Sequence, residues 1–176
     1  MRQNEMKARE LLRKYYVLAP PVPVEKIARG EGAQIARHRF EGWESGFILR
    51  DGRQTIIGVN TRTSRRRQRF TIAHEIGHFL LHEGALIVDH AVRVNWRDEV
   101  SGMATDTEEI EANTFAAELL MPREFVINKL EEYMKKIGTT NRTMSHEDLI
   151  TSLAREFDVS AEAMGYRLIN LGILAT

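Results

Sequence analysis

Hydrophobic positions along this chain follow a helical period near both ends and a shorter, strand-like rhythm between them. Residues 4 to 16 have the spacing of an amphipathic helix that Asn4 can cap, and residues 24 to 29 predict a short second helix. The next apolar segments are rich in β-branched residues, which favours strands: residues 34 to 40, 46 to 50 and 54 to 59. Because the turn signal Asp51-Gly52 joins the last two, we expect a small antiparallel sheet.

The pattern becomes helical again after Asn60. We expect a helix that Thr63 or Ser64 caps and that Gly84 ends. Its central residues are apolar nearly all round, which is typical of a buried helix. Residues 85 to 104 show no clear period, and we expect a loop of functional importance there.

Two further helices are expected beyond that loop. The first runs from Asp106 to Met121, with acidic residues in its first turn, where they suit the helix dipole, and with one apolar face. Pro122 ends this helix and opens the next one, which continues to Ile137 and which Gly138 ends.

The composition excludes several classes of protein. With 43% hydrophobic and 28% charged residues among 176, the chain is typical of a soluble globular protein long enough to bury a sizeable core. No apolar run approaches the roughly 20 residues of a membrane span and no signal peptide is visible, so we expect a cytoplasmic protein without membrane contact. The absence of cysteine excludes disulfides and thiol catalysis, so a metal ion must be bound by His, Glu or Asp.

The net charge is zero, but the charges are unevenly distributed. Residues 1 to 70 contain 16 Lys and Arg against 7 Asp and Glu, whereas residues 71 to 176 contain 9 against 18. A basic surface for nucleic acid, centred on Arg62 and the arginines between 65 and 69, is one interpretation. We favour the alternative that the two halves neutralise each other, because these arginines lead into the expected helix and are not interleaved with aromatic residues.

Candidate chemistry lies in the buried helix, where His74-Glu75-Ile76-Gly77-His78 matches the H-E-x-x-H pattern. On a helix, His74 and His78 lie one turn apart, with Cβ atoms roughly 5 to 6 Å apart, so both rings can bind one metal ion. Glu75 lies about 100° further round the helix, which suits a general base acting on a water at the metal. Two hydrogen-bonded core histidines are the alternative interpretation.

A catalytic zinc normally has three protein ligands and one open position, so a third ligand must come from elsewhere. A histidine at position 84 would complete a metzincin site, but that residue is Gly84. Helical rotation carries His82 away from the metal, toward a polar contact at the helix end. Glu109 and Asn113 lie one turn apart on the later helix, so they can supply a carboxylate ligand and an amide that orients an imidazole. We expect the neighbouring carboxylates to project into solvent: Glu108 and Glu111.

Two longer segments surround these residues. They are Arg69-Phe70-Thr71-Ile72-Ala73-His74-Glu75-Ile76-Gly77-His78 and Glu109-x-x-Ala112-Asn113-x-Phe115-Ala116-Ala117-Glu118-Leu119-Leu120-Met121-Pro122. Together they closely resemble the ImmA/IrrE family of zinc metallopeptidases, and the resemblance covers nearly the whole chain. It implies an α+β fold in which the small antiparallel sheet packs on a zincin-like helical core. It also implies a zinc ion bound by His74, His78 and Glu109, with Glu75 as the general base.

The resemblance further implies site-specific cleavage of a helix-turn-helix repressor, in stress response or in the control of mobile elements. Zinc can lower the pKa of a bound water from about 15.7 to about 7, and Glu75 would pass that water's proton to the leaving amine. Candidates for stabilising the oxyanion are Tyr166, Arg167, His90 and Arg93. The alternative is a non-cleaving DNA- or protein-binding regulator with a structural zinc, in which Glu75 would have no role.

The C-terminal residues 145 to 168 predict a helix, a turn and a second helix. Both helices have capping residues: Ser145 with Asp148, and Ser160. We expect residues 1 to 140 to form the metallopeptidase domain and residues 141 to 176 to form a helix-turn-helix-like segment packed on it. Direct nucleic-acid binding is not expected, because Arg167 is the only basic residue of the would-be recognition helix.

Overall fold

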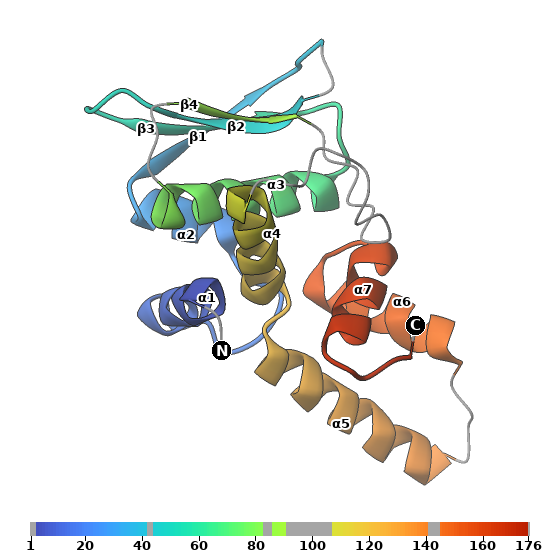
Figure 1. The fold of residues 1–176 in the computed structure, drawn as a ribbon. Helices are drawn as coiled ribbons and strands as arrows, with labels where there is room; N and C mark the ends of the chain where they lie inside the picture. Colours follow the sequence, from blue (N-terminus) through green and yellow to red (C-terminus); the bar gives the residue numbers. More distant parts are fainter. Residues whose placement is uncertain (1–2, 42–43, 83–85, 91–106, 141–144, 176) are drawn as a thin grey trace.

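The computed structural model describes residues 3–41, 44–82, 86–90, 107–140 and 145–175, which form an α+β fold (Figure 1). In chain order the elements are α1 (Gln3–Lys14), α2 (Val24–Gly30), β1 (Ala33–His38), β2 (Glu44–Arg50), β3 (Thr55–Asn60), α3 (Arg65–Leu81), β4 (Leu86–His90), α4 (Thr107–Leu120), α5 (Arg123–Thr140), α6 (His146–Phe157) and α7 (Ala161–Asn170). The sheet covers one side of α3, and α1 and α4 lie on its other side. None of the described helices is long and apolar enough to cross a membrane.

The sheet is mixed, with the strand order β1-β3-β2-β4. β2 and β3 are antiparallel, as predicted, and are joined by a turn in which Asp51 accepts hydrogen bonds from the backbone of Arg53 and Gln54. β1 instead lies parallel to β3, with Ala33 opposite Thr55, so the prediction of a purely antiparallel sheet is wrong. The pattern of short strand segments does not reveal which strands become neighbours, and here β3 lies between β1 and β2.

β4 is a second departure from the prediction. It occupies residues 86–90, inside the segment for which the sequence predicts a loop, and pairs with β2 in antiparallel fashion. Its three apolar residues, Leu86 to Val88, are followed by Asp89 and His90, and so short a segment without alternation gives no period by which a strand can be distinguished from a loop. The rest of that predicted loop, residues 91 to 104, lies outside the described residues.

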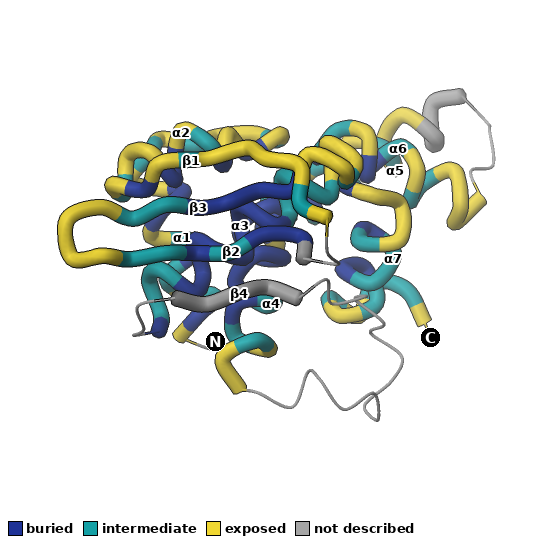
Figure 2. The backbone as a smooth tube through the Cα atoms, turned by 90° about the horizontal axis from the view of Figure 1, so that it is seen from above, coloured by how far each residue is buried: buried dark blue, intermediate teal, exposed yellow. Residues whose placement is uncertain are grey.

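The core lies between the sheet and α3 and extends to α1 and α4. Ile48 and Ile57 of the sheet and Ile72 and Ile76 of α3 are almost completely buried. Seen from above, the buried parts of β2 and β3 lie over α3 (Figure 2). Every residue of α3 from 71 to 78 is buried, which confirms the prediction of a buried helix.

Serine caps begin three of the helices, as predicted. Ser64 accepts a hydrogen bond from the backbone of Arg67 at the start of α3. At the start of α6, Ser145 and Asp148 form a complete capping box, and Ser160 caps α7. These side chains satisfy backbone N–H groups that have no partner within the helix.

Three predicted helix ends differ from those observed. Asn4 lies within α1 and donates a hydrogen bond to the backbone of α4, so it is not the cap of its helix. α3 ends at Leu81, before the predicted end at Gly84, which lies outside the described residues. α5 continues through Gly138, where the sequence predicts its end. A helical glycine costs only about 1 kcal/mol relative to alanine, so it does not by itself terminate a helix.

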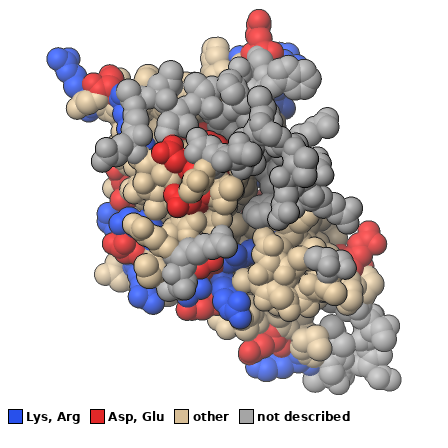
Figure 3. Space-filling model, viewed as in Figure 1, with Lys and Arg blue, Asp and Glu red and all other residues tan. Residues whose placement is uncertain are grey.

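Arginine contacts join the N-terminal and C-terminal halves of the chain. Three arginines at the start of α3 approach the carboxylate of Asp158, at distances of 3.4 to 3.7 Å: Arg65, Arg66 and Arg69. Arg9 of α1 likewise pairs with Glu118 of α4 at 2.8 Å. These ion pairs agree with neutralisation between the halves, and the described charges of both signs lie interspersed on the face in Figure 3. The division into two domains at residue 140 stays a prediction.

Candidate metal centre

α3 and α4 meet at a close helix contact that brings their polar residues together. At Gly77 of α3, a Cβ atom would lie only 3.1 Å from Cα of Ala112 and from the ring of Phe115 on α4. Because glycine lacks that atom, the two helix backbones can approach closely. The face of α3 that carries His74 and His78 therefore lies against the start of α4.

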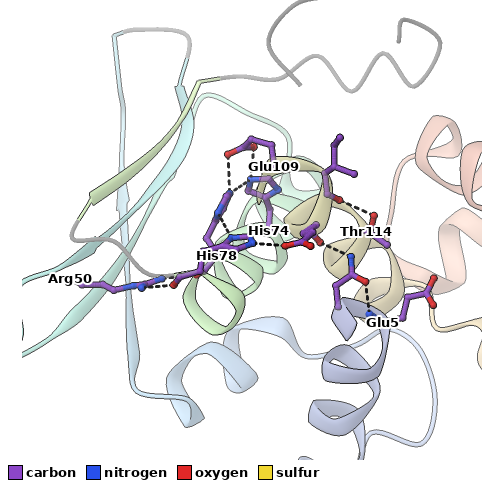
Figure 4. Close-up of polar contacts among 10 residues, drawn as sticks. Glu5, Arg50, His74, His78, Glu109 and Thr114 are labelled. Atoms are coloured by element: carbon purple, nitrogen blue, oxygen red, sulfur yellow. Dashed lines mark hydrogen bonds and ion pairs between the residues drawn. The ribbon is translucent and has the colours of Figure 1, made fainter. Parts of the chain in front are cut away.

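The side chains of His74, His78 and Glu109 point toward one another (Figure 4). His78 Nε2 lies 3.0 Å from His74 Nε2 and 3.0 Å from Glu109 Oε1, and His74 Nε2 lies 3.3 Å from Glu109 Oε2. Both histidines are buried, and the Glu109 side chain is 18% exposed. Among the described residues this is the only group of three such side chains close enough to hold one metal ion.

Asn113 contacts one of the two imidazoles, the arrangement that the sequence predicts. Its Oδ1 lies 3.1 Å from Nδ1 of His74. An amide oxygen only accepts hydrogen bonds, so the ring proton of neutral His74 lies on Nδ1. Nε2 of His74 then presents its lone pair toward Glu109, as a metal ligand must.

The arrangement fits a small divalent metal ion. Ligand atoms about 2.0 to 2.1 Å from a tetrahedral zinc lie about 3.3 Å apart, and the distances within this group are 3.0 to 3.3 Å. An imidazole lone pair and a carboxylate oxygen repel each other at such distances unless a proton or a cation lies between them. Two histidines and one glutamate are also a donor set of catalytic zinc sites.

The two histidines also influence the ionisation of Glu109. Burial alone raises the pKa of its carboxyl group, but in the metal-free protein hydrogen bonds donated by the protonated forms of His74 and His78, and the charges of those rings, lower it by more. The net pKa lies well below its usual range, so the carboxylate is ionised at neutral pH. An ionised carboxylate is the form that binds a metal ion.

Glu75, the predicted general base, lies on α3 beneath β2. It is completely buried, and its Oε1 lies 3.6 Å from the position that a Cβ atom would take at Gly46. That Cβ atom would also lie 2.4 Å from Thr71, so β2 can approach this part of α3 only because residue 46 is glycine. A completely buried carboxylate is costly to keep ionised, which makes Glu75 a candidate for a functional role.

His82 and Glu111 adjoin the site, which the sequence does not predict. His82 is the C-cap of α3, with an extended backbone, and its ring is buried. Its Nδ1 lies 3.0 Å from Nδ1 of His78, and its Nε2 lies 3.0 Å from Oε2 of Glu111. The predicted polar contact of His82 is therefore present. Glu108 is exposed, as predicted, but the prediction for Glu111 overlooks its bond to His82.

The candidates for stabilising the oxyanion fall into different surroundings. Arg167 is buried and donates to Glu118 and to a backbone carbonyl, which engages its guanidinium group in contacts within the core. Tyr166 lines a cavity beside α7. The backbone of His90 belongs to β4, but its side chain and the whole of Arg93 lie outside the described residues.

That cavity has a volume of about 520 Å³ and lies between the start of α3, the end of α4 and α7. Phe70, Ala117 and Ala163 contribute apolar surface to its lining. The ring of Phe70 also stacks on the ring of His74, with 6.3 Å between the ring centroids. The cavity therefore adjoins the group of candidate metal ligands.

Comparison with known proteins identifies three informative relatives. The chain is 28% identical over 161 residues to the radiation response metalloprotease IrrE of Deinococcus radiodurans, covering 91% of this chain and 44% of that protein. It is 34% identical over 147 residues to the protein of the same name from Deinococcus deserti, covering 79% and 47%. It is 35% identical over 77 residues to the uncharacterized immunity region protein 2 of Bacillus phage phi105, covering 44% of each chain. The chain thus spans less than half the length of these relatives.

Among solved structures, the fold is similar to that of a Mycobacterium tuberculosis transcriptional regulator. The TM-score is 0.60 at 17% sequence identity, and the similarity covers 96% of this chain and 46% of the regulator. At the sequence level, the profile of the IrrE N-terminal-like domain, Peptidase_M78, matches residues 28–169. Since that match covers most of the chain, the protein belongs to the ImmA/IrrE family of metallopeptidases.

Proposed function

We propose that this chain is a zinc-dependent endopeptidase that cleaves a helix-turn-helix transcriptional repressor at a specific site. The observation that carries the proposal is the convergence of His74, His78 and Glu109 on one point. Two imidazoles and one carboxylate leave a fourth zinc position open, which hydrolysis requires and a closed structural site lacks. Membership of a metallopeptidase family supports the same activity.

The residues of the site have separate parts in the proposed reaction. When bound, zinc supplies a Lewis acid that polarises the scissile carbonyl and lowers the pKa of a water from about 15.7 to about 7. Glu75 accepts a proton from the attacking water and delivers it to the nitrogen of the leaving amine. His74 and His78 hold the metal from α3 and Glu109 holds it from α4, so the packing of the two helices keeps the ligands together.

The repressor substrate is inferred from the relatives. One of them bears the name of a phage immunity region protein, and two are named radiation response metalloproteases. Control of phage or stress genes is therefore the context that we infer. We do not propose DNA binding by α6 and α7, because Arg167, the basic residue of α7, is buried against Glu118.

The cavity beside Phe70 would take an apolar side chain of the repressor next to the cleaved bond. It adjoins His74 through the stacked ring of Phe70, and alanine at position 163 leaves it open on the side of α7. Ala163→Phe should fill the cavity, so we expect it to abolish cleavage while the zinc content stays that of the wild type. Cleavage at the wild-type rate would contradict this use of the cavity.

A non-cleaving regulator with a structural zinc is the competing function. Glu75 argues against it, because a completely buried carboxylate costs stability and has no part in a closed structural site. The peptidase and the regulator would both contain zinc, but only the peptidase would cleave the repressor. An experiment that measures zinc content and cleavage therefore separates them.

The test compares the purified wild type with Glu75→Gln, Glu109→Ala and the control Glu108→Gln, which alters an exposed carboxylate beside the third ligand. Zinc content is measured first, and each protein is then incubated with the helix-turn-helix repressor encoded beside its gene. We expect stoichiometric zinc in all but Glu109→Ala. We expect cleavage by the wild type and by Glu108→Gln alone.

Other results would redirect the proposal. A wild type without zinc would overturn the metal site. Stoichiometric zinc in all but Glu109→Ala, with cleavage by none of the proteins, would favour the regulator over the peptidase. Full cleavage by Glu75→Gln would show that another group accepts the water's proton.

A further inference from the structure

A chain of three side chains leads from the surface of α4 to the ligand His78. Glu111, whose side chain is 45% exposed, accepts from Nε2 of His82 at 3.0 Å, and Nδ1 of His82 lies 3.0 Å from Nδ1 of His78. The side chain of His82 is only 4% exposed. The rings of His78 and His82 are thus buried, so the partners of each ring nitrogen determine where the hydrogen atoms lie.

The positions of the ring protons in this chain follow from the chemistry of its ends. A carboxylate oxygen only accepts hydrogen bonds, so Nε2 of His82 carries the proton of that neutral ring. Nδ1 of His82 is then an acceptor, and the proton between the two Nδ1 atoms belongs to His78. As a result, Nε2 of His78 presents a lone pair toward Glu109 and His74.

We propose that His82 is a positioning residue for the metal ligand His78, and that Glu111 acts on His78 through it. This inference rests on the metal site proposed above. It assigns to His82 and Glu111 the part that Asn113 has for His74, which is to fix the tautomer and the ring orientation of a ligand. α4 would then contribute one ligand, a direct hydrogen-bonding partner for His74 and, through His82, a group that acts on His78.

The end of α3 explains how His82 reaches this position. If α3 continued through residue 82, the helical rotation would fix the direction of that side chain. Here the helix ends at Leu81, and the backbone of His82 is extended, with φ −124° and ψ 151°. The ring can therefore lie between His78 and α4. Two hydrogen bonds from Arg50 hold this end of the helix, one to the carbonyl of His78 and one to the carbonyl of His82.

The experiment measures the dissociation constant for zinc by competition with a chromophoric chelator. His82→Phe keeps the ring but removes both nitrogens, whereas His82→Asn keeps an acceptor near the position of Nδ1. Loss of such a partner typically weakens metal binding about 10- to 100-fold, which we expect for His82→Phe, with a partial recovery in His82→Asn. Glu111→Ala should weaken binding less, because that side chain is partly exposed.

Two comparisons separate positioning from a purely structural contact. If Glu111 acts through His82, then Glu111→Ala should add nothing to the loss already caused by His82→Phe, although it weakens binding in the wild-type background. The cobalt-loaded His82→Phe protein should also have an altered visible absorption, which reports ligand geometry. Glu108→Ala removes an equal charge from the same helix turn and should leave the affinity within about twofold.

The outcomes are distinct. Zinc affinities of His82→Phe and Glu111→Ala within about twofold of the wild type would overturn the inference while leaving the metal site intact. Additive losses in the double variant would overturn the action of Glu111 through His82. A wild type that binds no zinc would overturn the metal site and this inference together. Glu111→Ala changes a partly exposed side chain, so it provides a test even if His82→Phe does not fold.

Discussion

The buried carboxylate of Glu118 allows a quantitative prediction of stability. It is 2% exposed and lies where α1, α4 and α7 meet. Arg9 of α1 donates to one of its oxygens at 2.8 Å, and Arg167 of α7 donates to the other. Arg167 also donates to the backbone carbonyl of Met121 at 2.9 Å and is itself buried. The pair therefore connects the C-terminal helices to the helix that carries Glu109.

Glu118→Gln keeps the shape of the side chain but removes its charge. One carboxylate oxygen becomes an amide nitrogen, which is itself a hydrogen-bond donor, so two donor groups would face each other. A hydrogen bond to a charged group contributes about 1.5 to 3 kcal/mol, and removing one partner of a buried ion pair costs about 3 to 5 kcal/mol. Because Arg167 would stay buried without a counter-charge, we expect the free energy of unfolding to fall by about 3 to 5 kcal/mol. Domains of ordinary stability have only about 5 to 15 kcal/mol in total.

The assay is urea-induced unfolding of the metal-free protein, followed by far-ultraviolet circular dichroism. The control is Glu132→Gln, because Glu132 pairs with Lys129 at a similar distance, 2.8 Å, but is 51% exposed. That exposed pair should contribute only about 0.2 to 1 kcal/mol. A loss in Glu118→Gln no larger than in the control would refute the reasoning, since burial would then have no effect on the strength of the ion pair.

Other predictions concern packing, capping and the metal. Gly46→Ala should lower the free energy of unfolding by about 1 to 3 kcal/mol, because its Cβ atom would lie 2.4 Å from Thr71. Gly165→Ala should instead raise the free energy of unfolding by up to about 1 kcal/mol, because Gly165 is helical and the nearest atom to its added Cβ atom would be 3.9 Å away. Thermal unfolding distinguishes these opposite signs. Ser145→Ala removes the capping box of α6 and should cost about 1 kcal/mol in the same assay, and an unchanged midpoint would contradict a role for that cap. Removal of zinc with a chelator should lower the unfolding free energy by about 2.7 kcal/mol, relative to protein at a free zinc concentration of 100 times the dissociation constant. Equal midpoints of thermal unfolding with and without zinc would argue against the metal site.

Local features of the fold were predictable from the sequence. A cap depends on a few neighbouring residues, so Ser64, Ser145 and Ser160 could be assigned from their positions before apolar helical segments. The H-E-x-x-H spacing likewise places two imidazoles on one helix face without reference to the rest of the chain. Glu109 could be proposed because it shares a helix face with Asn113, and the structure brings both residues to the histidines.

Features that depend on distant parts of the chain were not predictable in the same way. β1 pairs with β3 across 22 positions, as Ala33 lies opposite Thr55, and no local pattern specifies that neighbour. The contact between His82 and Glu111 depends on where α3 ends and on how α4 packs against it. The end of α3 and the packing of α4 are properties of the assembled helices. Glu111, which the sequence predicts to face solvent, therefore becomes a partner for the buried ring of His82.

The glycine at the crossing of α3 and α4 has a consequence for which ions the protein can select. With Gly77 packed against Ala112, the two sides of the triangle that join the histidines of α3 to Glu109 of α4, 3.3 and 3.0 Å long, depend on the close approach of the two helices. Calcium takes six to eight oxygen ligands at 2.3 to 2.6 Å, and magnesium prefers oxygen in octahedral geometry. As a metal site, a narrow triangle with two nitrogen atoms would therefore discriminate against both of these abundant cations. Equilibrium dialysis against mixed cations should show this selectivity in the wild type and its loss in Gly77→Ala.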